Sequence, residues 1–234
     1  MKKILVVGPA LPEWSDMRAI AKSLHFLSEH YELDFIDPLR DLNHHTDKLS
    51  FFSEWQRKIE SLLSKYDAFF GFSLGGVVLQ QCFDQLEKPN KPIVLFSVPS
   101  FSDKLISERL GKVISLIKEK KITPAISLLN QFVFYPYDLP SEDLALADPE
   151  SAALRLSSGL QFVLETDSRL ILQRTKLNYL HLLGAESQLV NSNNVIVSPS
   201  SQLVIVPQAG MRVLQDNLMH CTDSIVKFLK GRLS

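Results

Sequence analysis

The segment that most constrains the fold of this chain is residues 71–76, with the sequence GFSLGG. It follows the apolar run 67–70 and precedes a helix-like stretch at 77–82, so the sequence predicts a strand, a tight turn carrying Ser73, and a helix. Glycines at 71 and 75 leave room for a sharp, strained turn that would hold a serine hydroxyl exposed above the edge of a sheet. We therefore predict that Ser73 is a nucleophile.

The order of predicted elements indicates an α/β protein with a mostly parallel sheet and helices on both faces. Strand-like and helix-like segments alternate through the first hundred residues and stop alternating from about 101 to 176, where the sequence is helical and interrupted by Pro136 and Pro140. We predict a core of residues 1–100 and 177–234, and a helical lid at 101–176. The predicted strands are 4–7, 31–36, 67–70, 91–97, 177–183 and 202–206; the predicted helices include 17–27, 52–62 and 224–229.

Length and composition exclude several classes of protein. A chain of 234 residues that is 45% apolar can bury one sizeable core, and its formal net charge of −1 gives no general attraction to nucleic acid or to an anionic membrane. Cys82 and Cys221 are far apart and lack metal-ligand spacing, so we expect reduced, buried thiols.

The amino-terminal sequence predicts a first strand rather than a secretory signal. Its apolar run at 4–7 is shorter than the roughly 7 to 15 residues that a signal requires. No stretch approaches the roughly 18 consecutive apolar residues of a membrane span. We expect a cytoplasmic protein that binds neither nucleic acid nor membrane.

Several short motifs resemble the α/β-hydrolase superfamily, and within it the pimeloyl-ACP methyl ester carboxylesterases of biotin synthesis. These motifs are GFSLGG at 71–76, VLFSVPSFS at 94–102, SGL at 158–160, TDSR at 166–169, LHLLG at 180–184 and LV at 189–190. The resemblance implies that a serine attacks a carboxylic ester or acyl thioester, that a histidine takes its proton, and that an acid orients the histidine. It implies neither cofactor nor metal.

The resemblance also assigns the oxyanion hole, in which two backbone N–H groups hold the developing negative charge. The N–H of Leu74, directly after the nucleophile, is the first donor. The second comes from Ala10 or Leu11, because Pro9 has no N–H to give.

This chain departs from the family at the two other positions of the triad. Ser187 stands where the family has aspartate, and Met211 stands where it has histidine. Glu186 and Asp103 are the alternative acids, unless both are solvated loop residues. A thioether accepts no proton near neutral pH, so Met211 is not a general base.

The alternative bases are His220, near the last helix, and His45, which with His44 follows the second predicted strand. His181 lies in a predicted core strand, which favours a structural role, and no histidine pair has the spacing of a zinc site.

The lid is rich in cations, and the resemblance implies that such cations receive an acidic acyl carrier protein. The alternative is a solvated helix face. The cations are Lys104, Arg109, Lys112, Lys118, Lys120, Lys121, Arg155, Arg169, Arg174 and Lys176.

The lid also contains apolar residues that would either line an acyl pocket or form the lid's own core. They are Leu128, Leu129, Phe132, Phe134 and Tyr135.

Two functional hypotheses remain open from the sequence. The first is a serine hydrolase with a degenerate or relocated acid and base. The second is a pseudo-hydrolase that binds an acyl group or a protein without turnover. The intact turn at Ser73 favours the first, and Met211 favours the second.

Overall fold

The computed structural model of the protein describes residues 1–139 and 145–233. Its centre is one six-stranded sheet with the order β2-β1-β3-β4-β5-β6, in which every neighbouring pair is parallel. The predicted α/β fold class is confirmed. The strands are β1 (Lys2–Val7), β2 (Tyr31–Ile36), β3 (Ala68–Phe72), β4 (Ile93–Phe96), β5 (Tyr179–Gly184) and β6 (Gln202–Val206).

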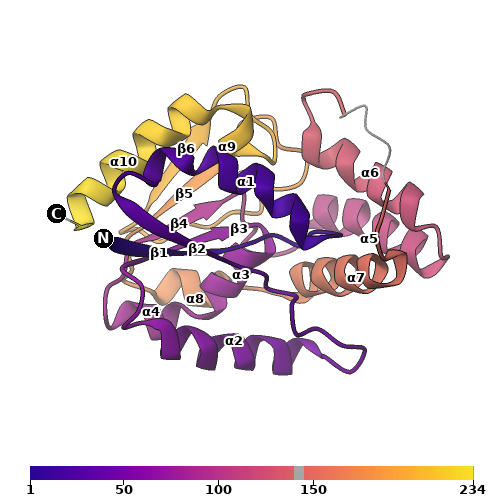
Figure 1. The fold of residues 1–234 in the computed structure, drawn as a ribbon, viewed down its shortest axis with the longest axis horizontal. Helices are drawn as coiled ribbons and strands as arrows, with labels where there is room; N and C mark the ends of the chain where they lie inside the picture. Colours follow the sequence, from indigo (N-terminus) through magenta and orange to yellow (C-terminus); the bar gives the residue numbers. More distant parts are fainter. Residues whose placement is uncertain (140–144, 234) are drawn as a thin grey trace.

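Helices cover both faces of the sheet (Figure 1). One face packs against α1 (Met17–Ser23), α9 (Val213–Asp216) and α10 (Leu218–Leu233). The other packs against α2 (Lys48–Leu62), α3 (Leu74–Gln81), α4 (Phe83–Glu87) and α8 (Arg169–Arg174). Short 3₁₀ helices span Trp14–Asp16 and His25–Leu27. Within the described residues, no helix combines the length and apolar character needed to cross a bilayer.

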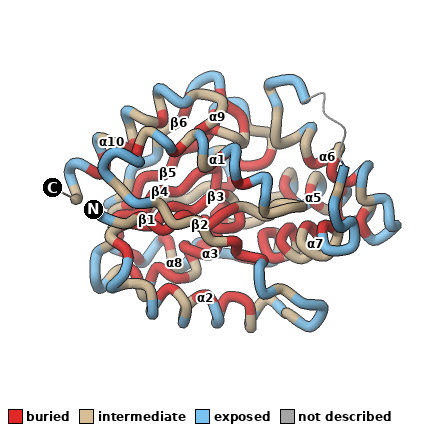
Figure 2. Tube along the Cα trace, in the orientation of Figure 1, coloured by how far each residue is buried: buried red, intermediate tan, exposed pale blue. Residues whose placement is uncertain are grey.

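Burial on both faces explains why the central strands β1, β3, β4 and β5 read as largely apolar runs rather than as alternating ones. In β1, Ile4 and Val6 enter the core beneath α1 and α10, whereas Leu5 and Val7 enter the core beneath α2 and α3. Buried residues accordingly follow the strands through the centre of the molecule (Figure 2).

Between β4 and β5 the chain forms α5 (Lys104–Lys118), α6 (Ile122–Phe134) and α7 (Pro149–Glu165) before α8. These three helices contact one another and lie together at one end of the sheet (Figure 1). Helix α8 instead lies against α3, where Gln81 donates a hydrogen bond to the Ser168 hydroxyl at 2.8 Å. The division into a core and a lid at 101–176 stays a prediction, and Pro140 lies outside the described residues.

Several predicted helix boundaries are wrong, including the start of α2 at Lys48 rather than 52 and the end of α10 at Leu233 rather than 229. The predicted helix 17–27 ends at Ser23 and gives way to a 3₁₀ turn. The closing helix begins at Leu218 rather than 224, because the Asn217 side chain accepts a hydrogen bond from the His220 N–H at 3.2 Å and so caps the first turn.

Candidate functional site

Ser73 occupies a strained turn between β3 and α3. Its φ is 46° and its ψ is −114°, a conformation that non-glycine residues rarely adopt. The turn is held at both sides, since the Ser73 N–H donates to the Phe96 carbonyl at 3.1 Å and the Ser73 carbonyl accepts from the Val77 N–H at 3.0 Å. Such a conformation costs on the order of 1–3 kcal/mol, which the surrounding packing must offset.

The glycines of the turn permit close packing of the surrounding chain. No glycine has a positive φ in the part of the chain that the structure describes; the strained residue is Ser73 itself. A Cβ on Gly75 would overlap the Val7 carbonyl oxygen, and a Cβ on Gly76 would overlap the Val98 side chain. The start of α3 therefore lies directly against the end of β1 and the loop that follows it.

The candidate oxyanion donors flank this junction. Leu74 is the first residue of α3, where a helix leaves its N–H without an intrahelical acceptor. Within residues 1–139 and 145–233, no protein acceptor is recorded for the N–H of Leu74, Ala10 or Leu11, or for the half-buried Ser73 hydroxyl. The turn at residues 71–76, called the elbow from here on, therefore offers a serine hydroxyl and a backbone N–H that make no recorded hydrogen bond within the described protein, and the loop after β1 offers two further N–H groups of this kind.

Ser187 and Met211, which are assigned from the sequence to the family's acid and base positions, lie against each other. The Ser187 hydroxyl oxygen is 3.9 Å from the Met211 sulfur, and it accepts hydrogen bonds from the backbone N–H of Leu189 at 3.4 Å and Val190 at 3.2 Å. The two loops also pair through the Glu186 N–H and the Ala209 carbonyl at 2.9 Å. The arrangement keeps the adjacency of an acid–base pair but has no group that titrates.

The two alternative acids have different surroundings. Glu186 is exposed. Asp103 caps α5, with one carboxylate oxygen accepting from the Ile106 N–H at 2.9 Å and the other from the Asn194 side chain at 3.2 Å. The prediction that Asp103 is the catalytic acid therefore concerns a carboxylate that already makes structural hydrogen bonds. Neither acid has a recorded contact with a histidine among the described residues, and both assignments stay predictions.

The alternative bases lie in two different parts of the fold. His220 is half-buried in the first turn of α10, and His45 is exposed in the loop between β2 and α2. No side-chain hydrogen bond links either imidazole to Ser73 within the described ranges, and their roles stay predictions.

His181 is fully buried in β5, as the sequence predicts for a structural residue. Its Nε2 accepts a hydrogen bond from the Val98 N–H at 3.2 Å, whereas its Nδ1 has no recorded protein partner among the described residues. Burial lowers the pKa of His181 from 6.5 to about 3, because the charged form cannot be solvated there. The imidazole is therefore neutral in the folded protein near neutral pH.

Helix α5 and the segment that directly follows α6 contact the loops that carry Ser187 and Met211. The Tyr137 hydroxyl donates to the Gln208 carbonyl at 2.8 Å, and a Cβ on Gly210 would overlap the Tyr135 carbonyl. From α5, Arg109 donates to the Gln188 carbonyl. These contacts were not predicted from the sequence, which offered only the cationic and aromatic character of the segment as a signal.

One cavity lies where α7 meets the segment after β1, a second lies between the segment after β2 and α2, and Ser73 lines neither. One, of about 230 Å³, is lined by Pro12, Glu13, Trp14, Ala147, Asp148, Ser151 and Arg155. The other, of about 70 Å³, is lined by Asp37, Pro38, Asp41, Leu42, Thr46, Phe51, Glu54, Trp55 and Lys58. No cluster of three or more metal-ligating side chains occurs in the described ranges.

Solved structures share this fold over nearly the whole chain. MenH from S. aureus superimposes with a TM-score of 0.71 at 16% identity, covering 100% of this chain and 95% of that one. The esterase EaEST from Exiguobacterium antarcticum gives 0.71 at 15%, with coverage of 98% and 92%. A bromoperoxidase from Bacillus anthracis gives 0.70 at 15%, with coverage of 98% and 92%. The chain has the α/β-hydrolase fold. No protein-family model and no curated protein sequence matches it.

Proposed function

From this fold and the geometry of the elbow, we propose that the protein is hydrolase-like and acts on a carboxylic ester or an acyl thioester through Ser73. The observation that carries the proposal is the left-handed backbone of Ser73, with a φ of 46°, in a residue whose hydroxyl has no recorded protein partner in the described ranges. A strained residue of this kind persists where the surrounding structure enforces it, and such residues cluster at active sites.

In the proposed reaction, the Ser73 oxygen forms a bond to the acyl carbon and its proton passes to water. The carbonyl oxygen becomes an oxyanion that accepts hydrogen bonds from the N–H of Leu74 and of Ala10 or Leu11. The leaving group departs with the electrons of its bond to the acyl carbon. Water then cleaves the acyl-serine and restores the hydroxyl.

A degenerate triad favours thioesters over alkyl esters as substrates. Met211 supplies no proton to a leaving group, and an alkoxide leaves poorly without one. A thiolate, whose parent thiol has a pKa of about 8.5, leaves without prior protonation. We therefore place an acyl thioester ahead of an alkyl ester.

The second candidate is a binding module without turnover, which retains the fold to hold an acyl group or a protein. The specific observation in its favour is the contact between Ser187 and Met211, at 3.9 Å, where an active relative needs an acid and a base. In this case, Ser73 is a remnant of the ancestral site.

Reaction with a fluorophosphonate probe separates the two candidates. We expect slow labelling of the folded protein that disappears in Ser73→Ala, because only an activated serine hydroxyl reacts with the probe. The readout is the labelled mass of the intact protein. Absence of labelling in folded wild-type protein would favour the binding module.

If the wild-type protein is labelled, His220→Ala and His45→Ala identify any substitute base. Loss of labelling in one of them would assign the base. Labelling that survives both substitutions would leave solvent as the proton acceptor.

We also propose an acyl carrier protein as the partner, from the resemblance to the carboxylesterases that act on such a carrier. Five of the ten predicted cations form ion pairs with carboxylates of this chain: Lys104 with Glu108, Lys121 with Glu119, Arg155 with Asp37, Arg169 with Asp167 and Arg174 with Asp84. Lys118 and Lys120 are exposed beside the α5–α6 turn and are the better candidates for an acidic partner.

Charge reversal tests this partner. We expect Lys118→Glu with Lys120→Glu to weaken binding of an acyl carrier protein about tenfold or more at low salt, because rim charges attract across an interface. Titration calorimetry measures the affinity, and Lys227→Glu on α10 is the matched control. Equal affinity for the variant and the wild type would remove the proposal.

Buried thiols support a reducing compartment, and we propose the cytoplasm. Cys82 and Cys221 are both free and buried, and burial raises the pKa of the Cys221 thiol to about 12. Neither thiol is arranged for disulfide exchange.

A further inference from the structure

Arg155, on α7, makes three hydrogen bonds to segments that are distant in sequence. Its Nε donates to the Leu11 carbonyl at 3.0 Å, and its two terminal nitrogens donate to the two carboxylate oxygens of Asp37 at 2.9 and 3.1 Å. The side chains of Arg155 and Asp37 are only 12% and 9% exposed. Paired, forked geometry of this kind is among the stronger charge-assisted interactions in proteins.

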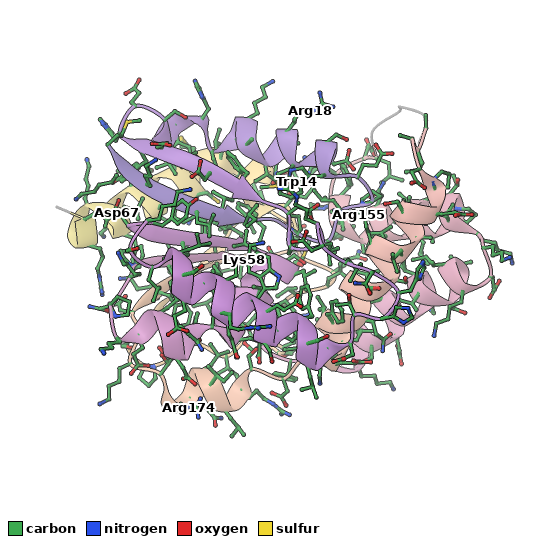
Figure 3. All side chains as sticks on the ribbon, turned by 60° about the horizontal axis from the view of Figure 1, so that its bottom comes forward. Trp14, Arg18, Lys58, Asp67, Arg155 and Arg174 are labelled. Carbon is green, nitrogen blue, oxygen red and sulfur yellow. The ribbon has the colours of Figure 1, made fainter. Side chains whose placement is uncertain are left out.

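Both partners of Arg155 belong to the sheet edge that carries the elbow. Asp37 directly follows β2 and also accepts from the Leu39 N–H at 2.9 Å, which fixes its carboxylate. Leu11 belongs to the loop after β1, where the second oxyanion donor is expected. Figure 3 shows Arg155 near Trp14, where α7 meets this loop, and both residues line the same cavity.

One helical turn further along α7, Gly159 lies against the two candidate oxyanion residues. A Cβ built on Gly159 would be 2.8 Å from the Ala10 Cβ and 3.4 Å from a Leu74 methyl carbon. Residues four apart share one face of a helix, so Arg155 and Gly159 present a single surface to the loop and the elbow. Helix α7 therefore contacts both sides of the expected oxyanion hole.

The loop itself has little freedom once Leu11 is held. Prolines at 9 and 12 flank Ala10 and Leu11, and each fixes its own φ and restricts the residue before it. The guanidinium of Arg155 then fixes the direction of the Leu11 carbonyl. That carbonyl belongs to the Leu11–Pro12 peptide, and its hydrogen bond with Arg155 limits how the neighbouring Ala10–Leu11 peptide, which carries the Leu11 N–H, can turn.

We infer that Arg155 is a positioning residue, which holds the loop 9–12 so that an N–H of Ala10 or Leu11 faces the reacting carbonyl at Ser73. The inference rests on the proposed function at Ser73. Donors fixed in advance stabilise an oxyanion without reorganising during the reaction, and loss of one such donor typically costs about 10²–10³-fold in rate. A loosened donor costs part of that factor.

Arg155→Lys tests the inference, because an ammonium pairs with Asp37 but lacks the planar fork that reaches the Leu11 carbonyl at the same time. We expect kinact for a fluorophosphonate to fall about tenfold or more, while KI and the melting temperature stay close to those of the parent. A purely structural role would lower the melting temperature without separating kinact from KI.

Arg155→Met with Asp37→Asn keeps the inference testable if the lysine variant folds poorly. It removes both charges together, which is usually tolerated far better than an unpaired buried charge, and the introduced amide oxygen would still accept from the Leu39 N–H. We expect the same fall in kinact. Arg57→Lys, at an exposed position of α2, is the matched control and should leave kinact unchanged.

The effect of Arg155→Lys on kinact is measured in the wild type and in a background carrying Ser187→Asp and Met211→His. Failure of the role of Arg155 and failure of the hydrolase function at Ser73 then give different results. Labelling absent from the wild type but present in that background would count against the hydrolase function and leave the effect of Arg155→Lys measurable. In either background that labels, an unchanged kinact in folded Arg155→Lys would overturn the role of Arg155.

Discussion

Replacing Met211 by His together with Ser187 by Asp should raise the rate of Ser73 labelling by about 10²–10⁴-fold, the usual contribution of a positioned general base. The two positions are already neighbours, with 3.9 Å between the Ser187 oxygen and the Met211 sulfur. The N–H groups of Leu189 and Val190, which donate to the Ser187 hydroxyl, would then hold an aspartate carboxylate. The measurement is the second-order rate constant for reaction with a fluorophosphonate.

The single variants and one triple variant make this result interpretable. Met211→His alone should give a smaller gain, because without the acid the imidazole is neither oriented nor stabilised when it takes the proton. Ser73→Ala in the double variant should abolish labelling. A folded double variant that reacts no faster than the wild type would show that the elbow and the loop of Met211 are not arranged for catalysis.

Acid should destabilise the folded protein strongly below about pH 6.5 through His181. The pKa of this imidazole is 6.5 when solvated and about 3 in the folded chain, where burial excludes its charged form. Between these values the unfolded chain takes up a proton that the folded chain does not. The free energy of unfolding should therefore fall by about 1.4 kcal/mol per pH unit as pH decreases, and this contribution of His181 is fully present above pH 6.5.

Urea denaturation at a series of pH values from 7 to 4.5 measures this slope. His181→Asn is the informative variant, because an amide oxygen can accept from the Val98 N–H, which now donates to Nε2 at 3.2 Å, and it does not titrate in this range. We expect the free energy of the variant to depend less steeply on pH than that of the wild type, by about 1.4 kcal/mol per unit. Parallel curves would mean that His181 is protonated in the folded state.

These two experiments concern two different imidazoles. His181 is the buried histidine in the described part of the chain, and its neutral state and its hydrogen bond with the Val98 N–H indicate a structural role. The first experiment returns an imidazole to the loop beside Ser187. The second separates the structural imidazole from any catalytic titration observed in the same pH range.

Local patterns in the chain were enough to predict the sheet and the elbow. Residues 4–7 form a strand as predicted, because an apolar run of that length is stable when both faces of a parallel sheet are buried. Residues 31–36 and 202–206 also form strands as predicted, but they are the partly exposed edge strands of the sheet. The turn at Ser73 was also predictable, since a serine between close glycines after a buried strand permits few other geometries. These features depend on neighbours in the chain.

The surroundings of the elbow depend instead on long-range packing. Ser187 and Met211 are 24 residues apart, and Arg155 and Asp37 are 118 apart, so no local pattern reports that they touch. The sequence presented Arg155 as one of ten lid cations, whereas folding buries it against the loop of Leu11. Packing determines which charge is solvated and which is enclosed, and that distinction separates a surface cation from a positioning residue.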